Sequence, residues 1–303
     1  MLSLFMYLTL SGYARASIVD IANITLNKEQ LLEHLSYLSS DELAGRKIDS
    51  IGNRKAQEYI INQLVSHSIL PLNKEYQHNF FSHMSGSNII AMIPGRQETE
   101  SYIVLSAHFD HIGKKGNKIY NGADDNASGT SALLSIAQQL IKNTLKHNII
   151  LLFTDGEELK LTGAKAFVKD HPNIMRHTKL NINLDMLAGS KRTKKLRYMT
   201  RGFNQLLNER NIEQLSTLQN SFDIPIIEGF KVKSFRGNRR IKWLLSSDHG
   251  VFHQAGIPFI YFGVGTHINY HESSDTYSNV NHEFFHLATD AIYQQLIFLD
   301  HNI

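Results

Sequence analysis

Residues 148–158 read NIILLFTDGEE, an apolar run that ends directly in acidic side chains. Four further runs of the same kind, short and rich in apolar residues, occur at residues 88–93, 102–106, 180–184 and 258–264. Near-continuous hydrophobicity over such short lengths is typical of strands that are buried on both faces, as in a parallel or mixed sheet covered by helices. Residues 148–158 therefore predict a strand inside such a sheet, with an acidic group at its carboxyl end.

Helical patterns surround these predicted strands. Apolar side chains recur at helical spacing in residues 29–38, 53–67, 126–142 and 282–299. Because strand and helix patterns alternate, the sequence predicts an α/β fold with a mixed, mostly parallel central sheet flanked by helices on both faces. We expect residues 17–303 to form a single domain, with a polar, basic insertion at residues 190–245.

The composition excludes several kinds of protein. The 31 Lys and Arg residues stand against 28 Asp and Glu, and the formal net charge of +3 is too weak to indicate a nucleic-acid-binding protein. Basic residues do cluster at residues 191–201 and 231–242, a pattern typical of solvated faces. The chain has no cysteine, so a thiol nucleophile is excluded and any metal must be held by His, Asp or Glu.

The first 16 residues resemble a secretory signal peptide. An apolar run over residues 1–10 is too short to cross a bilayer and is followed by Ala14-Arg15-Ala16. We therefore expect cleavage before Ser17, a periplasmic or secreted protein, and no membrane span after signal removal. Because residues 1–10 contain no Lys or Arg, a buried first helix is the alternative.

Acidic residues and histidines follow four of the predicted strands. In an open α/β sheet the ligand site lies beyond the carboxyl ends of the strands, so these side chains should converge. A His-x-Asp pair in extended backbone allows the carboxylate to accept the second N–H of the imidazole, and adjacent glutamates point in different directions, so one can bind a cation while the other moves protons. The residues concerned are His108, Asp110, Glu157, Glu158, Asp185 and His271.

One further motif opens the helix predicted at residues 126–142. Residues 121–129 read NGADDNASG, and either Asp125 or Asn126 suits the N-cap of this helix. Capping needs one such side chain, which leaves Asp124 free to bind a cation.

Together these motifs resemble peptidase family M28, a family of dizinc aminopeptidases. The resemblance extends over nearly the whole chain after residue 16, and its motifs occur in the order found in the family. They are SDELAGR (40–46), AHFDH (107–111), GADDNASG (122–129), EE (157–158), NLDM (183–186), SDH (247–249) and YH (270–271).

The resemblance implies a role for each candidate residue. Asp110 would orient His108, Glu157 would be the general acid and base, and Tyr270 would help to stabilise the oxyanion. The bond between Asp124 and Asp125 would be cis. The implied metal ligands are Asp124 as the bridge between two ions, Glu158 and His271 at one ion, and His108 and Asp185 at the other.

The resemblance also implies an activity, the hydrolysis of N-terminal residues from peptide substrates. Two divalent ions that share a water molecule lower its pKa and supply hydroxide near neutral pH. The expected ligands suit zinc, and manganese or cobalt would fit the same donors. Two alternatives remain open at this point, a glutaminyl-cyclase-like acyltransferase with one zinc and a non-catalytic binding domain on the same fold. Residues 159–163, LKLTG, depart from the usual family sequence and leave the side-chain preference open.

Overall fold

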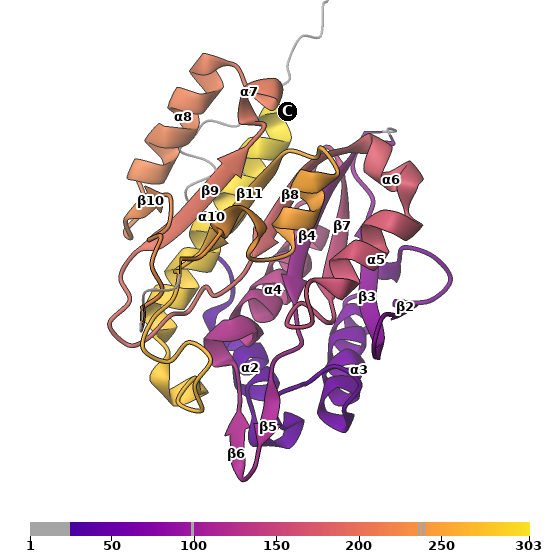
Figure 1. Cartoon of the computed structure of the whole chain (residues 1–303). Coiled ribbons are helices and arrows are strands. Elements are labelled where there is room, and N and C mark those ends of the chain that lie inside the picture. Colours follow the sequence, from indigo (N-terminus) through magenta and orange to yellow (C-terminus); the bar gives the residue numbers. More distant parts are fainter. Residues whose placement is uncertain (1–24, 98–99, 236, 238–239) are drawn as a thin grey trace, which may run out of the picture.

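The computed structural model describes residues 25–97, 100–235, 237 and 240–303 (Figure 1). Its strands are β1 (Leu70–Pro71), β2 (Gln77–Phe81), β3 (Ser85–Ile93), β4 (Tyr102–His108), β5 (Gly113–Lys115), β6 (Lys118–Tyr120), β7 (Asn148–Thr154), β8 (Thr178–Leu184), β9 (Leu196–Arg201), β10 (Ile226–Glu228) and β11 (Phe259–Gly263). The main sheet has the order β1-β3-β7-β4-β8-β11-β9-β10, with β2 also paired to β3, while β5 and β6 form a separate hairpin.

Parallel pairs occupy the middle of the main sheet. β7, β4, β8 and β11 run parallel to one another in that order, so their carboxyl ends meet at one edge. Antiparallel pairs flank them, β3 against β7 and β9 against β11. Along β4, Ile103 and Leu105 enter the core on one face and Val104 enters the core on the other, as expected for a strand covered on both sides. The predicted mixed α/β sheet is confirmed.

Helices cover both faces of the sheet (Figure 1). The larger core contains side chains from α2 (Lys28–Leu38), α3 (Ile51–Ser66), α4 (Gly129–Lys142), α8 (Glu209–Asn220) and α10 (His282–Asn302). The smaller core, on the opposite face, contains side chains from α5 (Thr162–Asp170), α6 (Pro172–His177) and α9 (His249–Gln254). The remaining helical segments are η1 (Asp41–Leu43), η2 (Ala123–Ser128), α7 (Phe203–Leu206), η3 (Trp243–Leu245) and η4 (Tyr277–Asn279).

Side-chain caps fix the start of several predicted helices. Asn27, Ser50 and Asn281 accept the N–H group three residues later at the starts of α2, α3 and α10. The helix predicted at residues 126–142 instead begins at Gly129, because the backbone dihedral angles at Asp125 and Asn126 are not helical. That interruption turns the chain toward the carboxyl edge of the sheet, where the candidate site lies.

The basic insertion at residues 190–245 is more ordered than its composition indicates. It contributes β9 and β10 to the edge of the sheet, and α8 packs against α10. The sequence pattern missed these elements because charged side chains interrupt the two strands and α8 has a polar outer face. The signal peptide expected at residues 1–16 lies outside the described residues, and no described helix is long and apolar enough to cross a membrane.

Candidate metal centre

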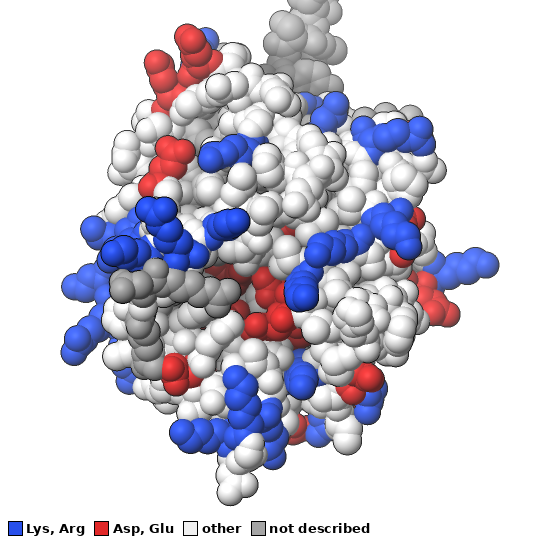
Figure 2. Space-filling view, viewed as in Figure 1, with Lys and Arg blue, Asp and Glu red and all other residues white. Residues whose placement is uncertain are grey.

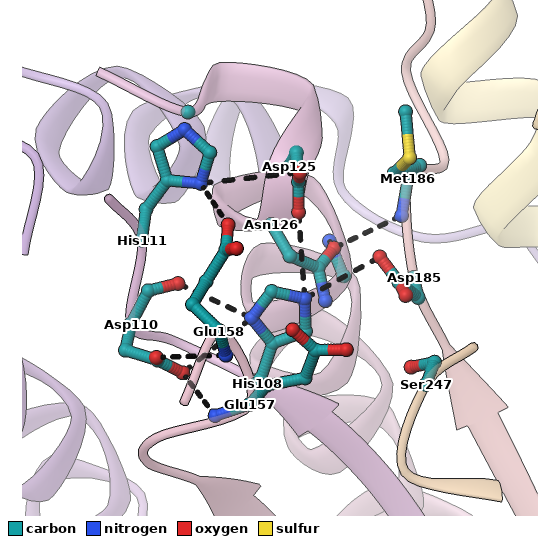
Figure 3. Close-up of polar contacts among 12 residues, drawn as sticks. His108, Asp110, His111, Asp125, Asn126, Glu157, Glu158, Asp185, Met186 and Ser247 are labelled. Carbon is teal, nitrogen blue, oxygen red and sulfur yellow. Dashed lines mark hydrogen bonds and ion pairs between the residues drawn. The ribbon is translucent and has the colours of Figure 1, made fainter. Parts of the chain in front are cut away.

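The carboxyl edge of the parallel strands carries the residues expected there. His108 ends β4, Glu157 and Glu158 follow β7, Asp185 follows β8, and His271 lies in the segment after β11. All five line one pocket with a volume of about 510 Å³. Figure 3 shows how the side chains from β4, β7 and β8 converge. We call these residues, together with His111 and Asp125 described below, the metal centre.

One group of possible ligands contains His108, Glu157 and Asp185. Each offers a ligand atom, and these atoms all lie within 4.8 Å of one another. Nε2 of His108 lies 3.4 Å from Oδ1 of Asp185 and 3.5 Å from Oδ1 of Asp125. The imidazole of His108 thus points between two carboxylates.

A second group contains His111, Asp125 and Glu158, again with ligand atoms within 4.8 Å of one another. Nδ1 of His111 lies 2.9 Å from Oε1 of Glu158. Nε2 of His271 lies 3.1 Å from Oδ2 of Asp125 and 3.4 Å from Oε1 of Glu158. Asp125 therefore directs one oxygen toward each group, which is the geometry of a bridging carboxylate.

The structure contradicts the expectation that Asp124 bridges the two groups. Its carboxylate accepts N–H groups from Ala188 at 2.7 Å and from Gly189 at 2.6 Å, and it lies 2.7 Å from Nε2 of His267. These contacts turn Asp124 away from His108 and saturate its oxygens. The bridging position belongs to Asp125, one residue later.

Hydrogen bonds in the same loop explain this shift. Asn126, rather than an aspartate, accepts the N–H of Gly129 at the start of α4, at 2.9 Å. The carboxylate of Asp275 accepts the N–H groups of both Asp124 and Asp125. Asp125 is thus held by its backbone while its side chain stays available. The cis bond likewise joins Asp125 to Asn126, not Asp124 to Asp125.

The loop requires glycine where it passes His111. Gly122 has a φ of +58°, and an added Cβ would lie 2.2 Å from the backbone oxygen of Asp125 and 2.6 Å from the His111 ring. Any side chain at position 122 would therefore displace the backbone of Asp125 or the imidazole of His111.

Asp110 contacts both His108 and the adjacent glutamates. Nδ1 of His108 bonds the backbone oxygen of Asp110 at 3.1 Å, whereas the Asp110 carboxylate lies 3.6 Å away, so the orienting contact is chiefly a backbone one. The carboxylate itself accepts the N–H groups of Glu157 at 3.0 Å and Glu158 at 3.3 Å. Asp110 thus fixes the positions of the adjacent glutamates relative to His108.

The pKa values of the two adjacent glutamates are shifted in opposite directions. Burial raises the pKa of Glu157 well above its usual value, and the neighbouring Glu158 and Asp185 charges add to this against the opposing effect of His108. Burial acts in the same direction on Glu158, but the close contacts of its carboxylate with the imidazoles of His111 and His271 outweigh it and lower the pKa of Glu158. The two adjacent glutamates therefore differ in chemistry: Glu157 is suited to exchange a proton, and Glu158 to remain a charged ligand.

Tyr270 lines the pocket and stacks on His271, with ring centroids 4.0 Å apart. Burial, reinforced by the charges of Asp125 and Glu158, raises the pKa of its phenol. The hydroxyl thus stays protonated and able to donate a hydrogen bond. Trp243 and Tyr261 form an aromatic wall nearby, with Phe230 stacked against both rings.

The donor set fits divalent metal ions. Oε1 of Glu158, Oδ1 of Asp185 and both ring nitrogens of His111 are buried and have no hydrogen-bond partner, although the two groups place nitrogen and carboxylate oxygen atoms side by side. Buried carboxylates without partners are costly unless a cation compensates them. Imidazole and carboxylate ligands suit zinc, so the residues present fit two such ions.

The sequence reasoning missed His111 and Asp125 as members of the site. Both stand in motifs quoted above, but neither the spacing of AHFDH nor that of GADDNASG shows which of two similar side chains points inward. Asp248 was missed as well: its carboxylate accepts the hydroxyl of Thr154 at the end of β7, and burial raises the pKa of Asp248 to about 6. The signal for Asp248 was its place in the SDH motif.

Comparison with known proteins identifies the family of the chain. The model of Peptidase family M28 matches residues 88–296, and the chain belongs to this family. Leucine aminopeptidase 1 of Trichophyton rubrum is 30% identical over 185 residues, which are 56% of this chain and 48% of that protein, so the match spans about half the length of this relative.

Solved structures of low sequence identity share the fold. A zinc aminopeptidase from Bacillus subtilis has a TM-score of 0.69 at 16% identity, over 90% of this chain and 95% of that chain. A glutaminyl cyclase from Porphyromonas gingivalis has a TM-score of 0.67 at 18% identity, over 92% of this chain and 99% of that chain. Because an aminopeptidase and a glutaminyl cyclase share this fold, the fold alone does not distinguish the two activities, and the distinction depends on the residues of the site.

Proposed function

We propose that this protein is a dizinc aminopeptidase that releases N-terminal residues from peptides. The observation that carries the proposal is the pair of adjoining ligand groups, in which Asp125 lies between His108 and Asp185 on one side and His111 and Glu158 on the other, with His271 beside the second group. Leucine aminopeptidase 1 and the Bacillus subtilis zinc aminopeptidase, similar in sequence and in fold respectively, support the same activity.

These residues would hold two metal ions, which when bound activate water and polarise the scissile carbonyl group. Glu157 accepts a proton from the attacking water and delivers it to the nitrogen of the departing amine, because an amide nitrogen leaves poorly without a proton. The raised pKa of Glu157 suits both halves of this transfer. Tyr270 donates its hydroxyl to the oxygen that gains negative charge.

The pocket also suits a free amino terminus. Four carboxylates line it, those of Asp125, Glu157, Glu158 and Asp185, and a carboxylate oxygen that does not bind metal can hold an α-ammonium group. The aromatic wall together with Met186 and Leu245 provides an apolar surface for the first side chain. We therefore expect a preference for apolar N-terminal residues.

The test compares leucine anilide and leucyl peptides with their N-acetylated counterparts. Losing a charge-assisted hydrogen bond should lower kcat/KM of the acetylated substrates at least about tenfold. A chelator should abolish activity. Equal kcat/KM for free and acetylated substrates would contradict the aminopeptidase function and would indicate an amide hydrolase that does not require a free amino terminus.

Counting metal ions on the purified protein separates the remaining alternatives. Two ions per chain support the peptidase, one supports the cyclase-like acyltransferase, and none supports a binding domain. Production of cyclised N-terminal glutamine without hydrolysis would favour the acyltransferase.

We further propose export, on the basis of the apolar residues 1–10 and Ala14-Arg15-Ala16. The protein recovered from its native host should begin at or near Ser17. Intact mass showing that Met1 is retained would contradict this.

A further inference from the structure

A second pocket, with a volume of about 570 Å³, adjoins the metal centre. Ser234, Trp243 and Thr266 line both pockets, so the two are continuous around the Trp243 side chain. Six cationic side chains line the second pocket, which we call the basic pocket. They are Arg192, Lys194, Lys195, Arg197, Lys231 and Lys233.

The basic pocket unites two stretches that are distant in sequence. Residues 192–197 lead into and begin β9, whereas residues 231–233 follow β10. Each stretch alone is typical of a solvated face, but the fold places them together at one side of the metal centre. Figure 2 shows this as Lys and Arg side chains gathered beside a recess with Asp and Glu at its base.

The charges in the basic pocket are not balanced by the protein itself. No Asp or Glu lines the pocket, and within the described part of the chain none of the six cations forms an ion pair with a carboxylate. Cations that cluster without counter-charges attract anionic ligands and repel cationic ones.

The wall between the two pockets has a defined structure. Trp243 donates its indole N–H to the backbone oxygen of Lys231 at 2.7 Å and stacks on Phe230, with ring centroids 4.6 Å apart. Arg197 donates to the backbone oxygen of Gly229 at 2.8 Å, which fixes one guanidinium at the basic pocket. The cations are thus attached to a wall that the substrate must pass.

The direction of the substrate follows from the charges. The N-terminal amine would lie among the four carboxylates of the first pocket, which Arg240 and Lys242 also line, whereas residues beyond the scissile bond must leave that pocket. We propose that the basic pocket binds a carboxylate on the leaving-group side of the peptide, so that the enzyme prefers substrates that are acidic downstream of the cleaved bond. This inference rests on the aminopeptidase function proposed above and names its substrate class.

The experiment uses the metal-loaded protein and peptides of the form Leu-Gly-Gly-Gly-amide, with Glu, Gln or Lys placed in turn at the second, third or fourth position. At low ionic strength, kcat/KM for the best-placed Glu should exceed that for Gln about tenfold, and Lys should be the poorest. The same series with a free C-terminus distinguishes a side-chain carboxylate from the terminal one.

A charge-reversed variant tests whether the basic pocket causes this preference. Lys194→Glu combined with Lys233→Glu leaves four cations against two carboxylates in the basic pocket and should lower the ratio of kcat/KM for the Glu peptide over the Lys peptide severalfold. The readout is a ratio within one protein, so a partial loss of folded enzyme does not affect it. The matched control is Lys114→Glu with Lys118→Glu, an equal charge change on exposed residues of the β5–β6 hairpin that line neither pocket. The control should keep the preference for Glu.

Each other result overturns the inference in a distinct way. Cleavage of leucine anilide with equal kcat/KM for Glu and Gln peptides would overturn it and leave the aminopeptidase standing. If the protein cleaves no substrate that has a free N-terminal amine, both proposals are overturned. Equal kcat/KM for Glu and Gln peptides, with retention of a DNA oligonucleotide that the charge-reversed variant loses, would assign the basic pocket to nucleic acid instead.

Discussion

The pocket at the metal centre and the basic pocket share three lining residues, yet the first holds buried carboxylates and the second holds exposed cations. Asp125 and Asp185 have side chains only 6% and 9% exposed, and strand ends and backbone N–H groups hold their loops in place. The lysines of the basic pocket stand on a surface insertion in contact with water.

This difference in burial indicates how tightly each region would hold its ligand. A buried carboxylate must be compensated within the site, so the metal centre indicates a tightly held cation. An exposed lysine is already stabilised by water and adds little binding energy singly, so the basic pocket indicates a diffusing anion attracted by several charges at once. The predictions below test this division.

The largest effect is expected from Glu157→Gln. This change removes the proton-transfer group and should lower kcat on leucine anilide roughly 100- to 10,000-fold. Elemental analysis should still find two metal ions, because Asp125, Glu158 and the histidines remain. Glu158→Gln is the matched comparison and should also lose bound metal. Near-normal turnover by the Glu157 variant would remove the general-base assignment.

The adjacent aspartates provide the second prediction. Asp125→Asn should lose bound metal, because its carboxylate faces both ligand groups. Asp124→Asn should keep the metal but unfold more easily by about 1.5 to 3 kcal/mol, since a charged acceptor of two backbone N–H groups is lost. Metal analysis and denaturant titration measure the two effects. The opposite pattern would return the bridge to Asp124.

Trp243→Ala should widen the connection between the two pockets. Removing the indole takes away apolar surface from the first pocket and the structured wall from the second. We expect the preference for leucine over alanine anilide to fall about tenfold, and the preference for downstream glutamate to fall with it. A change in just one of these preferences would show that Trp243 serves one pocket alone.

The smallest effect is expected from salt. Raising ionic strength to about 1 M shortens the screening length to about 3 Å, so the glutamate preference should decline severalfold. Hydrolysis of leucine anilide should change far less, because the metal centre is buried. A glutamate preference that persists in high salt would mean that the contact is a buried one.

The sequence predicted the sheet well because five strands are buried on both faces and so are nearly continuous in hydrophobicity. The same regularity brought His108, Glu157, Glu158 and Asp185 to one edge. What a linear pattern lacks is side-chain direction. Nothing in the spacing of two adjacent aspartates shows that the N–H groups of Ala188 and Gly189 engage the carboxylate of Asp124 and leave that of Asp125 free.

The insertion illustrates the other limit. Counting charges along residues 190–245 predicts two solvated faces, and each stretch taken separately fits that description. The basic pocket exists because β9 pairs with β11 and β10 with β9, a long-range arrangement that no local window contains.

Arg46 connects several of the loops described here. Its fully buried guanidinium donates to the backbone oxygens of Leu38, Phe109, Asn121 and Gly122, and burial lowers its pKa to about 10 without removing its charge. The loops carrying His108 and Asp125 are thereby tied to the same buried side chain. Loss of this one side chain would therefore disturb both ligand-bearing loops, whereas the contacts of Trp243 with Lys231 and Phe230 on the opposite wall do not depend on it.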